Sequence, residues 1–134
     1  MSGAKRLFFD TNVVVYLISG DAAKSSKAES LIGSGGVISV QVLNEFTSVA
    51  RRKLALTWAE IEDVLEALKA NLEIVPLTLG VHERAVALAS AHALNIYDAS
   101  IVAAAIDNDC DAVLSEDMQH GQKFDGLRID NPFR

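Results

Sequence analysis

The sequence is poor in the residues that crosslink or break a chain: its 134 residues include one cysteine, two prolines and eight glycines. With Cys110 alone, an internal disulfide is excluded, and proline and glycine are too scarce for a collagen-like or linker-like chain. The longest apolar runs, 13–18 and 101–106, are far shorter than the ~20 residues that span a bilayer. Residues 1–10 lack the pattern of an export signal. We therefore expect a cytoplasmic protein that does not contact a membrane.

Basic residues are outnumbered by acidic ones, twelve to eighteen, which gives a net charge of −6. Because affinity for phosphates comes mostly from Lys and Arg, this balance argues against tight non-specific binding to nucleic acid. It leaves room for a nuclease whose carboxylates are partly neutralised by metal ions. Half of the residues are apolar and 22% are charged, which suffices for a buried core. The length fits one domain over residues 1–134.

Short apolar runs alternate with longer helical patterns along the chain. The apolar runs predict four or five strands, at 7–9, 37–39, 74–75, 112–114 and 127–129. The spacing of apolar residues between them predicts helices over 12–19, 22–32, 40–54, 81–94 and 99–107. A capping box at 57–60 predicts the start of one more helix. Strands separated by helices favour right-handed crossovers and a parallel sheet. We therefore predict an α/β protein, a three-layer α/β/α sandwich around a mostly parallel sheet of four to five short strands.

Four carboxylates stand near the expected carboxyl ends of these strands. Asp10 directly follows the first strand, and Asp117 comes three residues after the fourth. Glu45 lies in the second turn of the helix behind the second strand, and Asp98 opens the most apolar helix. Taken singly, each has an ordinary structural explanation, as a helix cap, a solvated helix residue or a turn residue. Because ligands of such sheets sit beyond the carboxyl ends of the strands, we expect the four together at one edge.

Carboxylates crowded at one edge repel one another unless cations lie between them. Carboxylates and water are the ligands that suit Mg²⁺ and Mn²⁺. Ions held in this way activate water and stabilise charge on a phosphodiester in its transition state. Other chemistries lack support, because the sequence has no Cys–His pair close in sequence, no Gly-x-Ser-x-Gly, no P-loop and no Gly-x-Gly-x-x-Gly.

At these acids the chain resembles the PIN-domain family, and within it the VapC toxins of bacterial toxin–antitoxin pairs. The resemblance runs over about residues 7–133 and has the four acids in the family's order. It rests on four short motifs, Phe9-Asp10-Thr11-Asn12, Asn44-Glu45-Phe46, Tyr97-Asp98-Ala99 and Ser115-Glu116-Asp117. The chain departs from many relatives after the last acid, where Met118 stands in place of Phe.

The resemblance implies a metal-dependent endoribonuclease that acts as the toxin of a toxin–antitoxin pair. The acids of the four motifs would carry over as the catalytic and metal-binding residues, holding Mg²⁺ or Mn²⁺ directly or through water: Asp10, Glu45, Asp98 and Asp117. Thr11, Asn12 and Ser115 would be supporting polar residues that orient those carboxylates. The family also implies an RNA substrate, a homodimer and a cognate VapB-like antitoxin, whose C-terminal segment lies across the active-site groove.

Two further residues are candidates for substrate binding. Arg52 shares a polar helix row with Glu45 and so could face a phosphate, although cations at a helix end are commonly solvated. His120, three residues after Asp117, could contact substrate or transfer a proton, or be an ordinary loop histidine.

Two other functions remain open from the sequence. One is a phosphatase with Asp10 as its nucleophile, although haloacid-dehalogenase-like phosphatases carry a second Asp where this chain has Asn12. The other is a catalytically silent PIN-like module whose acidic edge binds a basic peptide.

Overall fold

The structure, a computed structural model, describes residues 5–134. The expectation that the chain has no export signal rests on residues 1–10, and residues 1–4 lie outside the described residues. The single domain over residues 1–134 stays a prediction. Six strands occur in the described part: β1 Leu7–Phe9, β2 Val37–Ser39, β3 Glu73–Val75, β4 Ala112–Leu114, β5 Lys123–Phe124 and β6 Leu127–Asp130. The helices are α1 Thr11–Val15, the 3₁₀ turn η1 Tyr16–Ile18, α2 Ala22–Gly33, α3 Val40–Arg52, α4 Trp58–Asn71, α5 Leu79–His92 and α6 Ile96–Asp107.

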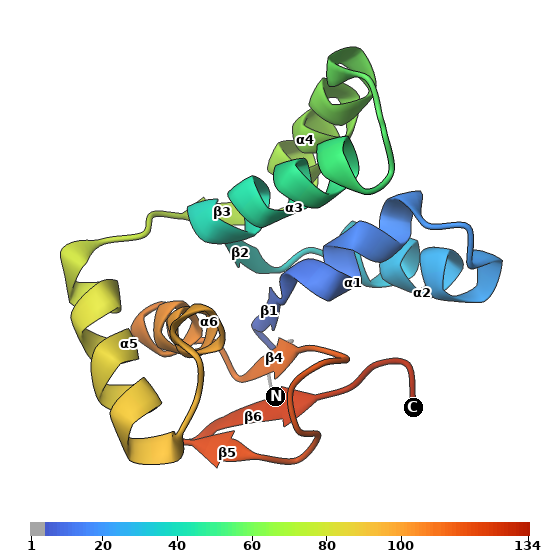
Figure 1. Cartoon of the computed structure of the whole chain (residues 1–134). Helices are drawn as coiled ribbons and strands as arrows, with labels where there is room; N and C mark the ends of the chain where they lie inside the picture. The colour runs from blue at the N-terminus through green and yellow to red at the C-terminus, as the bar shows by residue number, and fades with distance from the viewer. Residues whose placement is uncertain (1–4) are drawn as a thin grey trace.

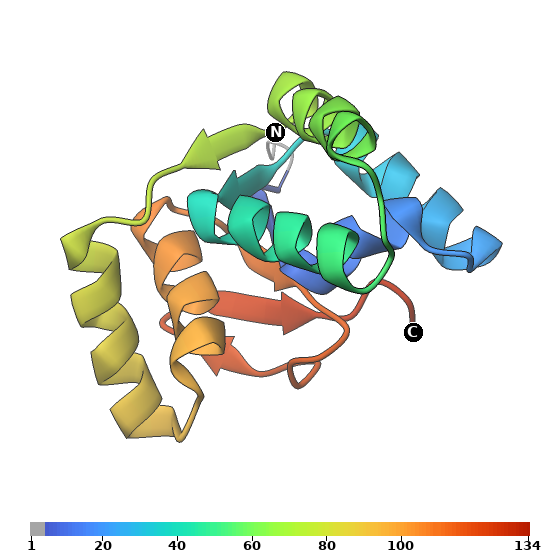
Figure 2. The same cartoon turned by 45° about the horizontal axis from the view of Figure 1, so that its top comes forward.

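The strands form one sheet in the order β3-β2-β1-β4-β6-β5, with helices packed around it (Figures 1 and 2). All neighbouring strands are parallel except β5, which pairs antiparallel with β6. Close packing of β1 and β2 requires glycine at Gly36, where φ is 147° and a Cβ would lie 2.4 Å from the Phe9 ring. The predicted mostly parallel α/β fold is confirmed.

The order of strands creates a crevice between β1 and β4. After β1 the chain moves outward to β2 and then β3, and after β3 it crosses back to β4 on the other side of β1. Such a reversal leaves a crevice beyond the carboxyl ends of the two central strands. Asp10 N–H donates to Leu114 O (3.0 Å), which keeps the ends of β1 and β4 together. The segments that carry Asp10 and Ser115–Asp117 therefore begin side by side.

Helix α6 is the most buried helix. Its residues from Ala99 to Ala105 are all buried, and it contacts β2, β4 and β6. The predicted all-round apolar character of this segment is therefore explained by packing on the sheet on one side and against α5 on another. Because α6 is fixed in this way, the position of its first turn relative to the strand ends is fixed too.

The structure corrects the strand count, because the sheet has six strands where four to five were expected. The additional strand, β5, has two residues and is defined only by its pairing with β6. A strand so short leaves no alternation in the sequence to detect.

Several predicted helix boundaries were also wrong. Residues 12–19 form α1 followed by the tighter turn η1, and α3 ends at Arg52, two residues early. Helix α5 starts at Leu79 because Thr78 caps it, accepting the Val81 N–H (3.1 Å).

Asp98 does not open α6, since Asn95 is the N-cap and Asp98 lies in the first turn. Within residues 5–134, no single helix is long and apolar enough to cross a membrane; α5 and α6 reach that length only as a pair bent by 119°.

Candidate functional site

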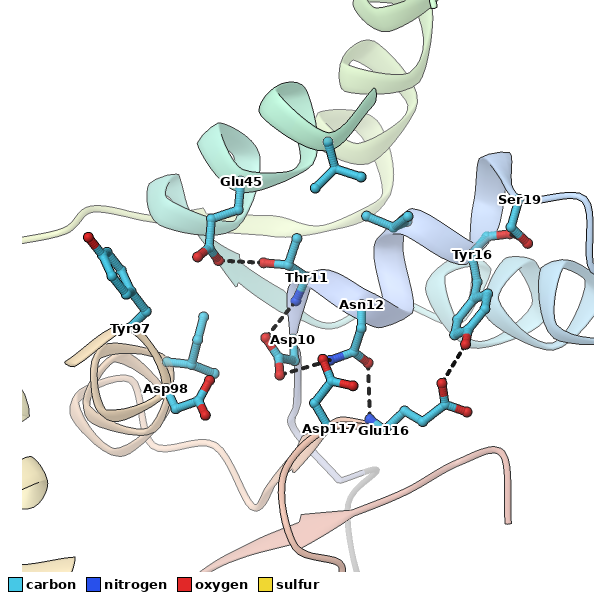
Figure 3. A pocket seen from close by; sticks show the side chains of 13 residues that line it. Asp10, Thr11, Asn12, Tyr16, Ser19, Glu45, Tyr97, Asp98, Glu116 and Asp117 are labelled. Atoms are coloured by element: carbon cyan, nitrogen blue, oxygen red, sulfur yellow. Dashed lines mark hydrogen bonds between the residues drawn. The ribbon is translucent and has the colours of Figure 1, made fainter. Parts of the chain in front are cut away.

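The four predicted carboxylates line one open cavity of about 430 Å³ at the carboxyl edge of the sheet (Figure 3). They come from four segments that are far apart in sequence: the end of β1, helix α3, the first turn of α6 and the loop after β4. Among residues 5–134, the lining is Asp10, Thr11, Asn12, Val15, Tyr16, Ser19, Glu45, Val49, Tyr97, Asp98, Ile101, Glu116 and Asp117. Folding therefore brings together the carboxylates that the sequence analysis singled out.

Asp10 is the most enclosed of these acids, with 6% of its surface exposed. It is the N-cap of α1, and its Oδ1 accepts the Thr11 N–H (2.7 Å). Its Oδ2 accepts bonds from the Ser115 hydroxyl (2.8 Å) and from Asn12 Nδ2 (3.0 Å). The N-cap explanation considered from the sequence thus holds for Asp10, and the same side chain also lines the cavity.

Burial raises the pKa of Asp10 from its usual 3.8 to about 6. The hydrogen bonds from Ser115 and Thr11 lower this pKa, while the nearby charges of Asp98 and Glu45 raise it. Burial therefore outweighs the hydrogen bonds, because a carboxylate removed from water loses more stabilisation than these bonds return. Near neutral pH, Asp10 carries a negative charge that a cation would stabilise.

Glu45 and Asp98 are each held by hydrogen bonds with one other residue. Glu45 lies on α3, whose buried residues Val42, Phe46 and Ala50 set the rotation of the helix. Its Oε1 accepts a hydrogen bond from the Thr11 hydroxyl (2.7 Å). Asp98 is held by Asn95, which accepts the Asp98 N–H (2.9 Å) and donates to Asp98 Oδ2 (3.0 Å).

The predicted supporting residues link the segments that carry the acids. Asn12 Nδ2 donates to Asp10 and, at 3.4 Å, to Asp117 Oδ2, while Asn12 Oδ1 accepts the Glu116 N–H (3.0 Å). Ser115 is fully buried, and its hydroxyl oxygen accepts the N–H groups of Asp117 (3.2 Å) and Met118 (3.1 Å). These bonds tie the end of β1 to the loop after β4.

No positively charged side chain neutralises the four acids. Among residues 5–134, none of Asp10, Glu45, Asp98 and Asp117 forms an ion pair with Lys, Arg or His. In the same part of the chain, no three carboxylate, histidine or cysteine side chains already converge as a ligand set. Mg²⁺ does not require such a set, since it keeps several waters and takes one or two carboxylates from the protein. The four acids at this edge offer only oxygen atoms as metal ligands, which fits that mode of binding.

A fifth carboxylate, Glu116, was missed by the sequence analysis. It lines the cavity but its charge is matched, because Lys24 Nζ lies 2.6 Å from Glu116 Oε2 and the Tyr16 hydroxyl donates to Oε1. These two partners lower the pKa of Glu116. Glu116 stands between two predicted residues, yet nothing in the sequence indicates its pairing with Lys24, 92 residues away.

The two predicted substrate-binding residues lie outside the cavity lining. Arg52 lines a smaller neighbouring cavity of about 280 Å³, and Val49 borders both. His120 is exposed, and its Nδ1 accepts the Asn131 N–H (2.9 Å), so it holds the C-terminal segment.

A mostly parallel sheet with carboxylates gathered beyond its central strands defines an α/β protein with an acidic ligand site. The sequence gives a narrower assignment, because residues 7–123 match the model of the PIN domain, and the protein belongs to the PIN-domain family. No curated protein gives a significant match to the chain.

Solved structures with the same fold include toxins and toxin–antitoxin complexes. A toxin–antitoxin complex from Klebsiella pneumoniae has 22% identity and a TM-score of 0.72, covering 94% of this chain and 97% of that chain. DNA-bound VapBC from Salmonella typhimurium has 19% identity and a TM-score of 0.72, covering 96% and 99%. VapC20 of Mycobacterium tuberculosis, described as a toxin that cleaves the sarcin-ricin loop, has 18% identity and a TM-score of 0.68, covering 83% and 91%. At these identities the likeness shows a shared fold.

Proposed function

We propose that this protein is a metal-dependent endoribonuclease that hydrolyses phosphodiester bonds of RNA. One observation carries the proposal: four carboxylates from four distant segments line one cavity, and the most buried of them, Asp10, has no cationic partner in the described chain. A fold has little reason to gather unpaired acids, because each buried negative charge destabilises it. A divalent cation at the cavity removes that penalty.

Asp10, Glu45, Asp98 and Asp117 would hold Mg²⁺ or Mn²⁺, directly or through water. When bound, the ion supplies positive charge beside the phosphodiester and lowers the pKa of water. Thr11, Asn12 and Ser115 orient the carboxylates through the hydrogen bonds described above. In the hydrolysis, water would add to phosphorus as the P–O bond to the leaving oxygen breaks, and the proton that the water loses would be balanced by one gained by the leaving oxygen.

Arg52 is the proposed contact for a substrate phosphate, because its cavity adjoins the acidic one at Val49. A role for His120 in substrate binding stays a prediction. Its Nδ1 accepts the backbone N–H of Asn131, so only Nε2 is left to contact a substrate.

We further propose that the protein is the toxin of a toxin–antitoxin pair, inhibited by a VapB-like antitoxin, and that it forms a homodimer. The PIN-domain match and the fold shared with the toxin of the Salmonella complex support this role. Co-purification with a small DNA-binding protein encoded beside this one, together with loss of RNA cleavage in the complex, tests it. Undiminished cleavage in a stable complex contradicts the inhibitory role.

The nuclease is tested by incubating the purified protein with RNA in Mg²⁺, in Mn²⁺ and in chelator. We expect cleavage with either metal and none in chelator. Asp10→Asn, Glu45→Gln, Asp98→Asn and Asp117→Asn should each lower the rate by at least about 100-fold, because losing a ligand costs more than losing the partner of a ligand.

Three results would contradict the proposal. Absence of cleavage with any divalent metal would favour a silent binding module. Metal-dependent cleavage that survives in Asp10→Asn would remove the acidic cavity as its source, and a phosphorylated Asp10 trapped from a phosphate ester would indicate the phosphatase.

A further inference from the structure

Tyr97 presents the most exposed large hydrophobic ring at the acidic cavity, with 66% of its surface accessible. It directly precedes Asp98 in the first turn of α6. In Figure 3 its ring stands at one side of the cavity, between the helices that carry Asp98 and Glu45. A tyrosine ring at the rim of a cavity is placed to contact a ligand that enters the cavity, because it offers a large apolar surface with a polar end.

The backbone at Tyr97 is fixed although the ring is exposed. Its carbonyl oxygen accepts a hydrogen bond from Gln41 Nε2 (3.1 Å), and Gln41 is a buried polar residue of α3, 8% exposed. This bond joins the first turn of α6 to the start of α3, the helix of Glu45. The ring of Tyr97 is therefore attached at a defined distance from two of the four acids.

Tyr16, at the opposite side of the cavity, makes the contacts that Tyr97 lacks (Figure 3). The Tyr16 ring packs edge-on against Phe133 at 4.9 Å between centroids, and Lys24 Nζ lies 4.9 Å from its centre. Within residues 5–134, the Tyr97 ring makes no such aromatic or cation contact. With 66% of its surface exposed, Tyr97 is thus accessible to a flat ligand.

The chemistry of the cavity favours a nucleobase as that ligand. A polyanion gains little from the charge of this protein, which is −6, so RNA must gain affinity from contacts that do not depend on charge. Stacking on an aromatic ring is such a contact, and every base has a face for it. The apolar side chains of Val15, Val49 and Ile101 also line the cavity and add surface for an uncharged group.

We propose that Tyr97 is a base-stacking residue, which binds a nucleobase adjoining the phosphodiester that is cut. The inference rests on the proposed nuclease function and adds to it a binding site for the base. It also explains why the residue beside Asp98 is a tyrosine exposed at the rim. The ring acts on substrate binding, whereas the carboxylates act on the reaction.

The test compares Tyr97→Ala, Tyr97→Leu and Tyr97→Phe in cleavage of short unstructured RNA oligonucleotides with Mg²⁺. Loss of the ring in the Ala and Leu variants should raise KM by about 5- to 150-fold, the range for losing one stacked base, with little change in kcat. Tyr97→Phe should behave like the wild type. Trp58→Ala removes another exposed ring, on α4 outside the cavity, and should leave KM unchanged.

A second readout locates the stacked base. Oligonucleotides carrying one 2-aminopurine, moved a position at a time, are mixed with Asp10→Asn, in which cleavage should be slow enough for binding to be followed. At one position the fluorescence should be quenched by stacking, and adding Tyr97→Leu to this background should abolish the quenching.

Three results would overturn the inference. KM could be unchanged in Tyr97→Leu, or Leu could serve as well as Phe, which would make the contact merely apolar. Tyr97→Ala could instead dissociate a homodimer in sedimentation, which would place the ring in a subunit interface. If the wild-type protein cleaves no RNA, the proposed function fails and this inference with it, whereas normal cleavage with an indifferent Tyr97 defeats the inference alone.

Discussion

At the scale of single residues, Asp10 illustrates how a functional group is kept at a cost to stability. The fold surrounds it with three hydrogen-bond donors, from Thr11, Asn12 and Ser115. Burial nevertheless dominates, and the pKa of Asp10 rises to about 6. A carboxyl with this pKa is mostly ionised at neutral pH and is therefore ready to bind a cation.

The first prediction concerns the stability of the metal-free protein. Because the pKa of Asp10 is higher in the folded chain than its usual 3.8, folding takes up protons between about pH 4 and 6. The contribution of Asp10 to stability is therefore lost as the pH rises through that window, by up to about 3 kcal/mol. In chelator, the free energy of unfolding of the wild type should fall relative to Asp10→Asn from pH 4 to 7.

Denaturant unfolding of the two proteins at several pH values measures this difference. Added Mg²⁺ should restore the wild type at neutral pH, since the ion binds the folded form, and should do little for Asp10→Asn. A difference between the two proteins that is constant with pH would show that Asp10 titrates normally.

The second prediction concerns Ser115. Its hydroxyl donates to Asp10 and thereby lowers the pKa of that carboxyl. Ser115→Ala should raise the pKa of Asp10 further. As the pH is lowered, metal-dependent cleavage should therefore begin to decline at a higher pH than in the wild type. The substitution should also destabilise the protein by about 1–3 kcal/mol, because the buried N–H group of Met118 and the partly buried N–H group of Asp117 lose their acceptor.

Ser100→Ala is the matched control for Ser115→Ala. Ser100 is also buried, but its hydroxyl bonds only to the Ile96 carbonyl within α6. The pH profile of cleavage should not move in this variant. An equal shift in both variants would mean that loss of stability, and not the contact with Asp10, moves the profile.

At the scale of elements, the residues that cap the helices also hold the site together. Asp10 caps α1, and Ser39 caps α3 by accepting the Val42 N–H (3.4 Å). Asn95 caps α6 and also donates to the Asp98 carboxylate. Each cap stands where a strand or loop enters a helix at the edge that bears the cavity.

The third prediction separates the two roles of Asn95. Asn95→Ala removes both the cap and the donor to Asp98, whereas Thr57→Ala removes only the capping box of α4, remote from the cavity lining. Each change should lower the free energy of unfolding by about 1 kcal/mol. Asn95→Ala alone should raise, by about 10-fold or more, the Mg²⁺ concentration needed for half-maximal cleavage.

Metal titrations of cleavage, with chemical unfolding in parallel, give both quantities for each variant. Equal metal requirements in Asn95→Ala and Thr57→Ala would show that Asp98 needs no support from Asn95.

At the scale of the whole molecule, charge and apolar surface are distributed for different partners. The four acids, which form no ion pair within residues 5–134, face one cavity, while large apolar side chains are exposed at Trp58, Leu79 and Val86. Leu79 and Val86 lie seven residues apart on α5 and therefore on one face of that helix, where we expect another protein to bind. The acidic cavity, by contrast, needs a cation before it can attract a phosphate.

The fourth prediction is that the protein is a homodimer. Sedimentation velocity should give twice the mass of the chain, 14.4 kDa, over a wide range of concentrations. Leu79, with 73% of its surface exposed on α5, is the substitution site of choice, and Leu79→Asp should weaken a dimer that buries it. A monomer that cleaves RNA at the full rate would contradict the prediction.

Much of the fold could be predicted from the sequence. Buried strands such as β1, β2 and β4 appear as short apolar runs, and the capping box at Thr57 and Glu60 marks the start of α4. Where the signal was weak, the prediction failed. Strand β5 has only two residues. The start of α6 was placed at Asp98, although Asn95 is the N-cap, because Asn and Asp are about equally good caps and the sequence does not distinguish them.

What the sequence alone determined was the set of acids and the kind of fold. Periodicity sets which segments become strands and helices, and parallel strands bring their carboxyl ends to one edge, so Asp10, Glu45, Asp98 and Asp117 could be grouped in advance. Only the tertiary structure decided how enclosed each acid is, which donors it meets, and that Glu116 is matched by Lys24 whereas the four are not. The reason is physical: burial, pKa and pairing depend on distances between residues as much as 105 positions apart, such as Asp10 and Ser115, and local sequence carries no record of them.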